Sequence, residues 1–131
     1  MILGLDVSTS ITGVTVLGDD GDVVFNDAWD FRNKNHFPTL FHKGHEIKEL
    51  LLQLKLEYNI SSVFIEQSLQ SFRSGFSSAK TLSTLSRFNG IVSWLCYEVF
   101  ELEPEYIAAT SARKICGITI PRGTKAKQVV I

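Results

Sequence analysis

The chain has few cysteines, and their positions exclude two common kinds of site. Its 131 residues include only Cys96 and Cys116, which stand far apart in the sequence. This spacing gives neither the CxxC pair of a zinc or redox site nor the dense pattern of a disulfide-stapled secreted domain. We therefore expect two reduced thiols that pack inside an intracellular protein.

A basic leader and long apolar runs are also absent. The first residues, Met1–Asp6, reach a carboxylate without passing a basic residue, which is not the pattern of a signal peptide. No apolar run approaches the roughly 20 residues that a membrane-spanning helix needs. We expect a cytoplasmic protein without a membrane partner.

A strong excess of charge of either sign is missing as well. Thirteen Lys and Arg stand against fourteen Asp and Glu, so the net charge of −1 does not draw the protein to nucleic acid or anionic lipid. Any basic surface must be local. The composition, with 44% hydrophobic and 21% charged residues, is typical of a globular protein. The length predicts one domain over residues 1–131.

The opening third of the chain predicts three strands. Apolar and β-branched residues dominate 2–7 and 11–17, and a third extended stretch covers 23–31. Polar turn residues at 8–10 and 18–22 separate these stretches. They predict a three-stranded antiparallel meander.

The middle of the chain predicts a crossover helix and then a strand parallel to the first. Apolar residues recur at helical spacing over 38–58, and 61–66 has the pattern of a short buried strand. A strand after a crossover helix usually joins the same sheet. We expect a loop over 67–78, a long helix over 79–100 and a last strand over 105–109. The fold class is therefore α/β, with helices flanking a mixed five-stranded sheet of three antiparallel strands followed by parallel ones.

The long helix over 79–100 carries three stripes when its residues are placed at 100° intervals. The broad apolar stripe comprises Leu82, Leu85, Phe88, Val92, Leu95, Cys96 and Val99. The second stripe consists of small residues, namely Ala79, Ser83, Ser86, Gly90 and Ser93. The third comprises Lys80, Arg87 and Trp94. Small residues allow a close approach, so the second stripe can contact another chain or pack on the sheet.

Two acids stand in apolar strands, where an ionised carboxylate is costly without compensation. Asp6 follows Ile2–Leu5, and Glu66 follows Val63–Ile65. If the two strands are neighbours, both acids can reach one position of the sheet. Paired carboxylates suit Mg²⁺, with Mn²⁺ as the alternative ion. Otherwise, each acid marks a strand end or meets a Lys or Arg.

The segment from Tyr106 to Ile131 contains no acid and is the candidate phosphate-binding surface. Its end predicts a helix with Thr124 as N-cap, where free backbone N–H groups favour phosphate oxygens. A solvated loop is the alternative, because runs of like charge are common on surfaces. The basic residues of this segment are Arg113, Lys114, Arg122, Lys125 and Lys127.

The loop over 67–78 carries two large aromatic residues, Phe72 and Phe76, with Arg73 between them. Exposed aromatic rings can stack on bases or wedge between them. Alternatively, both rings fold back onto the core.

Three histidines have no zinc-binding spacing, so we expect them on the surface. They are His36, His42 and His45.

Three motifs, in this order, resemble those of RuvC-type Holliday-junction resolvases, which have a ribonuclease H-like fold. They are Gly4–Ser10 with Thr12 and Gly13, then Phe64–Gln67, and then Gly123–Val129. The likeness spans nearly the whole chain. It implies a magnesium-dependent, dimeric endonuclease that nicks two strands of a four-way DNA junction symmetrically.

The resemblance also implies roles for single residues. Asp6 and Glu66 are similar to the first two metal-ligating catalytic acids of the family, and Lys127 is similar to its active-site lysine. Phe72, or else Phe76, is similar to the aromatic residue that enters the junction centre. The long helix would form the dimer contact. Together with the basic segment, the expected DNA contacts are Phe72, Arg73, Phe76, Lys80, Arg113, Lys114, Arg122, Lys125 and Lys127.

One departure from the family pattern concerns the acids. The family takes two further carboxylates from a C-terminal helix, whereas no acid follows Glu105 here. Two-metal cleavage needs enough carboxylates to hold both ions. We therefore expect this form to bind metal weakly and cut poorly, either as a C-terminally shortened nuclease or as a natural binder of junctions.

Two other functions are compatible with parts of the sequence. Actin-like ATPases and sugar kinases also begin with an apolar strand, an Asp and a Gly-Ser-Thr turn, but they clamp a nucleotide between two such domains, and 131 residues supply one. A non-catalytic module for branched DNA would need the basic segment but not the pairing of Asp6 with Glu66.

Overall fold

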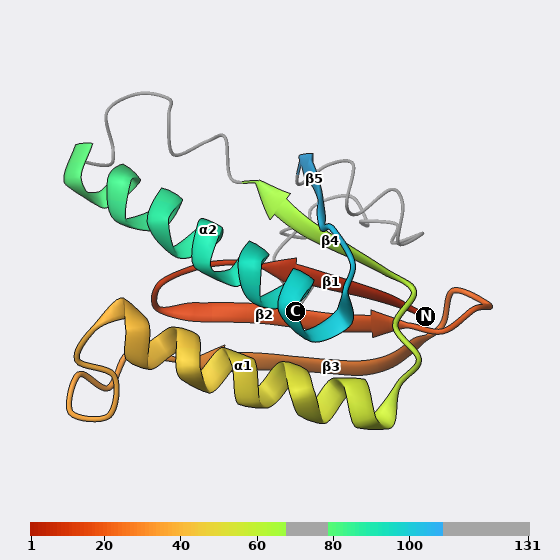
Figure 1. Cartoon of the computed structure of the whole chain (residues 1–131). Helices are drawn as coiled ribbons and strands as arrows, with labels where there is room; N and C mark the ends of the chain where they lie inside the picture. Colours follow the sequence, from red (N-terminus) through yellow and green to blue (C-terminus); the bar gives the residue numbers. More distant parts are fainter. Residues whose placement is uncertain (68–78, 109–131) are drawn as a thin grey trace, which may run out of the picture.

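The structure, a computed structural model, describes residues 1–67 and 79–108. Its elements are β1 (Ile2–Asp6), β2 (Ile11–Leu17), β3 (Val23–Asp30), α1 (Leu40–Glu57), β4 (Ser62–Gln67), α2 (Ala79–Phe100) and β5 (Glu105–Ala108), shown in Figure 1. Each element that was expected in these ranges is present, with ends that differ by at most two residues. The loop expected over 67–78 lies outside the described residues except for residue 67, and the helix expected after Thr124 lies wholly outside them.

The five strands form one mixed sheet in the order β3-β2-β1-β4-β5. The pairs β1–β2 and β2–β3 are antiparallel, whereas β4 is parallel to both β1 and β5. This arrangement confirms the expected meander followed by parallel strands. It also places β1, which carries Asp6, between β2 and β4 near the middle of the sheet.

Helix α1 makes the crossover that brings β4 beside β1. It begins after Thr39, whose side chain accepts a hydrogen bond from the backbone N–H of His42 and so caps a free helical donor. Its apolar positions Ile47, Leu51 and Leu54 are buried. Burial of this stripe against the sheet holds the helix in place, since most of the stability of a helix in a protein comes from packing of its apolar face.

Both helices cover the same face of the sheet (Figure 1). The core between them contains Leu3 and Leu5 of β1 and Val63 and Ile65 of β4, together with the buried stripes of α1 and α2. The helices approach closely at Gly44, where an added Cβ would lie 3.0 Å from the side chain of Ile91. An ion pair of 2.8 Å between Lys48 and Glu98 joins α1 to α2 on the outside.

The three stripes of α2 have separate surroundings. The apolar stripe is buried from Phe88 to Val99, as expected. The small residues Ser83, Ser86 and Gly90 are exposed, whereas Ser93 at the end of this stripe is half-buried and accepts a hydrogen bond of 2.7 Å from the Tyr106 hydroxyl of β5. Trp94 is 60% exposed.

The interior thiol behaves as expected. Cys96 is a free, buried cysteine, and burial raises its pKa to about 12 because the thiolate would lose its hydration. Cys116 lies outside the described residues.

Across residues 1–67 and 79–108, neither α1 nor α2 combines the length and the apolar character that a bilayer crossing requires.

Candidate functional site

The candidate site lies at the carboxyl end of β1 and β4. The parallel register pairs Asp6 with Glu66, one step after Leu5 pairs with Ile65. Because side chains alternate along strands, the buried Leu5 and Ile65 point towards the helices, and the two acids point to the opposite face. Neighbouring strands lie about 4.8 Å apart, so both carboxylates can reach one ion. The adjacency predicted for the two acids is present, whereas their roles stay predictions.

The turn that follows Asp6 is fixed by Thr12. The Thr12 side chain is fully buried, and its hydroxyl donates to the backbone oxygen of Ser8 at 2.9 Å while accepting from the Ser8 N–H at 3.3 Å. The side-chain oxygens of Ser8 and Ser10 share a hydrogen bond of 3.0 Å across the turn. These bonds restrict the backbone directly after the first acid.

Helix α1 also holds this turn. The ammonium group of Lys43 donates to the backbone oxygen of Thr9, which lies between β1 and β2. Partial burial lowers the pKa of Lys43, and the nearby charge of Lys34 lowers it further. In the sequence Lys43 stands between apolar helix positions, which does not predict this contact with the turn between β1 and β2.

The donor set fits one hard cation. Mg²⁺ is commonly held by one or two carboxylates, with water and substrate oxygens completing its octahedron. Asp6 and Glu66 supply two such carboxylates. Within residues 1–67 and 79–108 no cluster of three or more acidic, histidine or cysteine side chains is present. The described part therefore offers ligands for one ion and not the larger set that two ions need.

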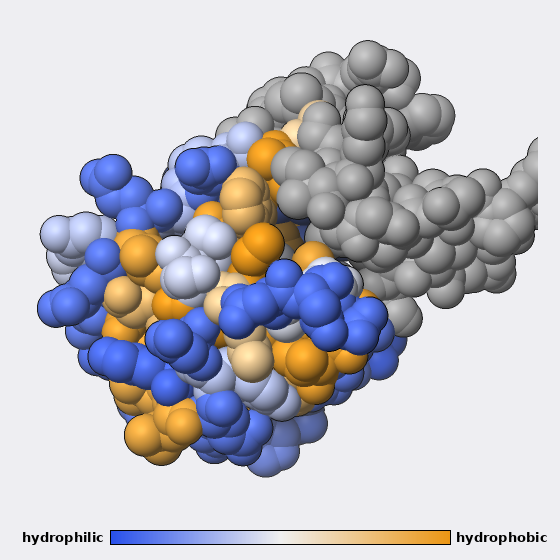
Figure 2. All heavy atoms as spheres, turned by 90° about the vertical axis from the view of Figure 1, so that its right-hand side faces the viewer, coloured by the Kyte–Doolittle hydropathy of each residue, from blue (hydrophilic) through white to orange (hydrophobic). Residues whose placement is uncertain are grey.

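Charge is distributed unevenly between the two ends of the sheet. The turn between β2 and β3, at the end away from the candidate site, carries Asp19, Asp20 and Asp22. Figure 2 views the molecule from that side and shows hydrophilic residues interspersed with apolar ones. By contrast, the segment 31–45 at the site end contains no acid. Its basic residues are Arg32, Lys34 and Lys43, with His36, His42 and His45 beside them.

The structure describes one of the expected DNA contacts. Lys80 is exposed in the first turn of α2, which lacks an acid. The three histidines are exposed, as expected. The remaining candidates lie outside the described residues. They are Phe72, Arg73, Phe76, Arg113, Lys114, Arg122, Lys125 and Lys127.

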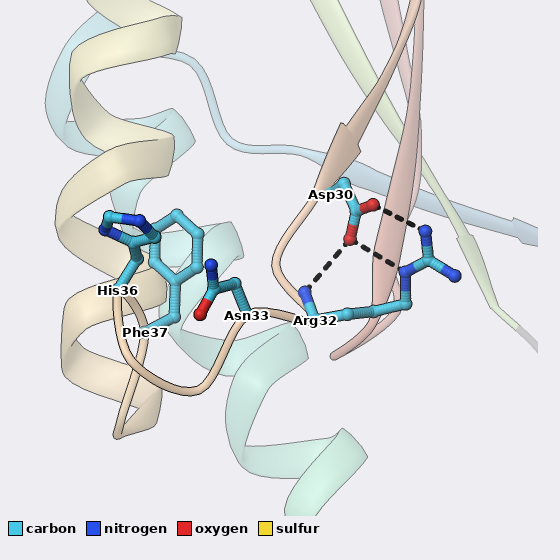
Figure 3. Close-up of a pocket in the computed structure, with 5 residues that line it drawn as sticks. All are labelled: Asp30, Arg32, Asn33, His36 and Phe37. Carbon is cyan, nitrogen blue, oxygen red and sulfur yellow. Dashed lines mark hydrogen bonds and ion pairs between the residues drawn. The ribbon is translucent and has the colours of Figure 1, made fainter.

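One feature at this end was not predicted from the sequence, an open pocket between the end of β3 and the start of α1. It is lined by Asp30, Arg32, Asn33, His36 and Phe37 (Figure 3). The signal in the sequence was the absence of acids over 31–45, but half of the basic and histidine residues there are histidines, so the segment does not stand out as a basic run.

The comparisons with known proteins identify the fold. RuvC of Thermus thermophilus in complex with a Holliday junction substrate matches with a TM-score of 0.67 and 10% identity, over 98% of this chain and 87% of that chain. Another T. thermophilus RuvC structure matches with a TM-score of 0.60 and 12% identity, over 98% and 88% of the two chains. No family model and no curated protein matches the sequence. The chain thus has the ribonuclease H-like fold of RuvC, as the sequence motifs suggested.

Proposed function

We propose that this chain is a metal-dependent endonuclease domain that hydrolyses phosphodiester bonds in branched DNA, with the four-way junction as its substrate. The observation that carries the proposal is the register that brings Asp6 beside Glu66 at the end of two central parallel strands. The RuvC fold supports it, because a structure of that fold contains a Holliday junction substrate. Residues 1–131 form one domain in this proposal.

Each acid has a defined task. Asp6 and Glu66 would hold the ion, Mg²⁺ or else Mn²⁺. The ion would supply Lewis-acid stabilisation of the charge that develops on the phosphate oxygens. The buried Thr12 keeps the turn after Asp6 rigid, so that this carboxylate stays aligned with its neighbour on β4. Lys127 is proposed to steady the phosphate or the nucleophile.

The DNA contacts follow from charge and ring chemistry. We propose that the basic residues among the expected contacts bind backbone phosphates, namely Arg73, Lys80, Arg113, Lys114, Arg122 and Lys125. Such contacts give affinity without sequence preference. Phe72 and Phe76 are proposed to stack against bases at the branch point.

We also propose that two copies pair through the exposed side of α2. Ser83, Ser86 and Gly90 leave room for a close helix contact, and Gly90 has no atom within 4 Å of an added Cβ. Beside them, the exposed rings of Trp94 and Tyr97 lie 5.8 Å apart between centroids. Exposed aromatic residues of this kind are enriched in protein interfaces. Pairing would present two sites to the two strands of a junction.

One observation favours a second function, binding of branched DNA without cleavage. Asp6 and Glu66 form a pair of acids, and no group of three or more possible metal ligands is present among the residues that the structure describes. A module that lacks further metal ligands would retain its phosphate contacts and lose turnover. The two functions therefore predict different nicking but the same affinity for the junction.

The test compares nicking with binding on a labelled four-way junction in Mg²⁺. Asp6→Asn and Glu66→Gln each remove a negative metal ligand while keeping the side-chain shape, so we expect nicking to disappear and the junction affinity to stay within about threefold, because phosphate contacts dominate affinity. Glu57→Gln, an exposed acid at the far end of α1, is the matched control and should nick like the unmodified chain.

Three outcomes are distinguishable. Selective loss of nicking in the two site variants supports the nuclease. Tight junction binding by the unmodified chain without any nicking supports the second function. Loss of binding in Asp6→Asn and Glu66→Gln that equals their loss of nicking contradicts the roles given to these acids.

A further inference from the structure

The open pocket at the β3–α1 connection has a preformed aromatic wall. The ring of Phe37 packs edge-on against Phe31 with centroids 5.4 Å apart, and Phe31 packs in the same way on Phe88 of α2 at 6.4 Å. Phe31 is buried, whereas Phe37 is half-buried. The exposed part of Phe37 is therefore a fixed apolar surface that is anchored to the core, with the ring of His36 next to it (Figure 3).

The loop that carries this wall is tied together by Asn33. Its backbone oxygen accepts hydrogen bonds from the N–H groups of His36 and Phe37, at 3.2 and 2.9 Å. Its side-chain oxygen accepts from the N–H of Asn35 at 3.0 Å. These bonds leave the side-chain NH₂ of Asn33 available as a donor at the rim of the pocket.

The opposite wall holds a pre-oriented guanidinium group. Asp30 accepts from Nε and Nη2 of Arg32 at 2.9 and 2.7 Å, and also from the Arg32 backbone N–H at 3.0 Å. The Arg32 side chain is nevertheless 65% exposed, and its third nitrogen points away from Asp30 (Figure 3). Asp30 thus fixes the plane of a cation whose remaining N–H groups face solvent.

The pocket and the candidate active site share one end of the sheet. Asp30 pairs with Ile11, the next residue donates its N–H to the backbone oxygen of Ser10, and Lys43 bonds the same turn at Thr9. Strand β3 lies two strands from β1, a distance of about 10 Å. Ten ångströms correspond to the axial rise of roughly three base pairs of duplex DNA.

We infer that this pocket is a nucleotide subsite for the DNA strand that runs from the candidate active site across β3. The phosphate contacts Arg32 and the exposed Lys34, and the base lies against Phe37 with the amide of Asn33 at its edge. The inference rests on the proposed function, because it needs DNA at the acid pair. It adds a base contact about three nucleotides from the cut, and with it a source of positional preference.

A nucleotide fits this chemistry better than an anion or an apolar ligand alone. A simple anion would use Arg32 and Lys34 but leave the aromatic wall unused. An apolar ligand would meet an exposed carboxylate and guanidinium. A nucleotide combines a charged group with a flat ring, and single-stranded DNA sites commonly join basic side chains to stacking platforms.

The test uses junctions in which one nucleotide at a time is replaced by an abasic analogue, scanned over the five positions on each side of the cut. Phe37→Leu keeps apolar packing on Phe31 but removes the stacking ring. We expect it to weaken binding about fivefold or more on the intact junction. We expect no further loss when the contacted position, about three nucleotides from the cut, is already abasic.

The phosphate contact is tested separately with Lys34→Gln, an exposed change that leaves the pocket intact. It should lower affinity on every junction sequence and reduce the slope of log affinity against log salt by about one. Lys55→Gln, at the far end of α1, is the matched control and should leave the slope unchanged. Circular dichroism melting of Phe37→Leu separates a lost contact from a folding defect.

The outcomes separate this inference from the function on which it rests. If the unmodified chain binds the junction and neither Phe37→Leu nor Lys34→Gln changes binding, the subsite is refuted and the proposed function stands. If Phe37→Leu weakens binding equally with every abasic analogue, the base contact is refuted. If the unmodified chain neither binds nor nicks the junction, the proposed function fails as well.

Discussion

Replacing Thr12 by valine tests how the turn after Asp6 is held. Valine has nearly the same shape as threonine but exchanges the hydroxyl for a methyl group. At position 12 this exchange removes the bond to the Ser8 oxygen at 2.9 Å and the bond from the Ser8 N–H at 3.3 Å. Since Thr12 is fully buried and Ser8 is half-buried, both Ser8 groups lose a partner that water replaces only in part.

Leaving a buried polar group without its partner costs about 1–3 kcal/mol. We expect Thr12→Val to lower the free energy of unfolding by about 2 kcal/mol, the middle of that range, because water reaches one side of the turn. Urea unfolding followed by circular dichroism measures this as a lower midpoint with an unchanged m value. Because the turn positions Asp6, nicking should fall as well, while junction affinity stays unchanged.

Thr12→Ser is the control for this prediction. It keeps the hydroxyl and removes one methyl group, which costs about 1 kcal/mol of lost burial. Nicking should therefore survive in Thr12→Ser and fall in Thr12→Val. If Thr12→Val unfolds at the same urea concentration as the unmodified chain and nicks equally fast, the hydroxyl does not hold the turn.

Two other changes test the helix surface and the pocket. Gly90→Ala should raise stability by about 0.5–1 kcal/mol, since its methyl group meets no atom within 4 Å and alanine favours the helix; Gly90→Arg should shift the chain from dimer to monomer in sedimentation, and an unchanged dimer would contradict pairing through α2. The Arg32 guanidinium lowers the pKa of Asp30 from 3.8 to about 2, so this acid stabilises the fold above pH 4 and the contribution is lost as the pH falls towards 2. Asp30→Asn should consequently flatten the acid side of the stability curve in that window, and an unaltered curve would refute the coupling.

Much of the fold could be predicted from the sequence because local signals and long-range packing agree. Strand β2 has the predicted bounds, Ile11–Leu17, since polar turns delimit it on both sides. That Asp6 and Glu66 lie on neighbouring strands could also be predicted. The register follows because a shift by one residue would turn Leu5 or Ile65 out of the core.

Other features depend on contacts that no local pattern encodes. Lys43 stands between apolar helix positions like any surface lysine, and only the tertiary fold brings its ammonium group to Thr9. The pocket wall needs Phe37 to pack on Phe31, which is itself fixed by Phe88 from a distant helix. Nor did the sequence indicate that α1 and α2 would cover the same face of the sheet, leaving the acids on the other.

The parallel pairing of β1 with β4 has a consequence for how the protein matures. The partner of Asp6 is sixty positions further along the chain, and the whole of α1 lies between the two strands in the sequence. Contacts between such distant segments are among the slower ones to form. A nascent or partly folded chain therefore carries its two acids apart. On the proposed function, the ability to cut DNA would appear only once β4 has paired with β1.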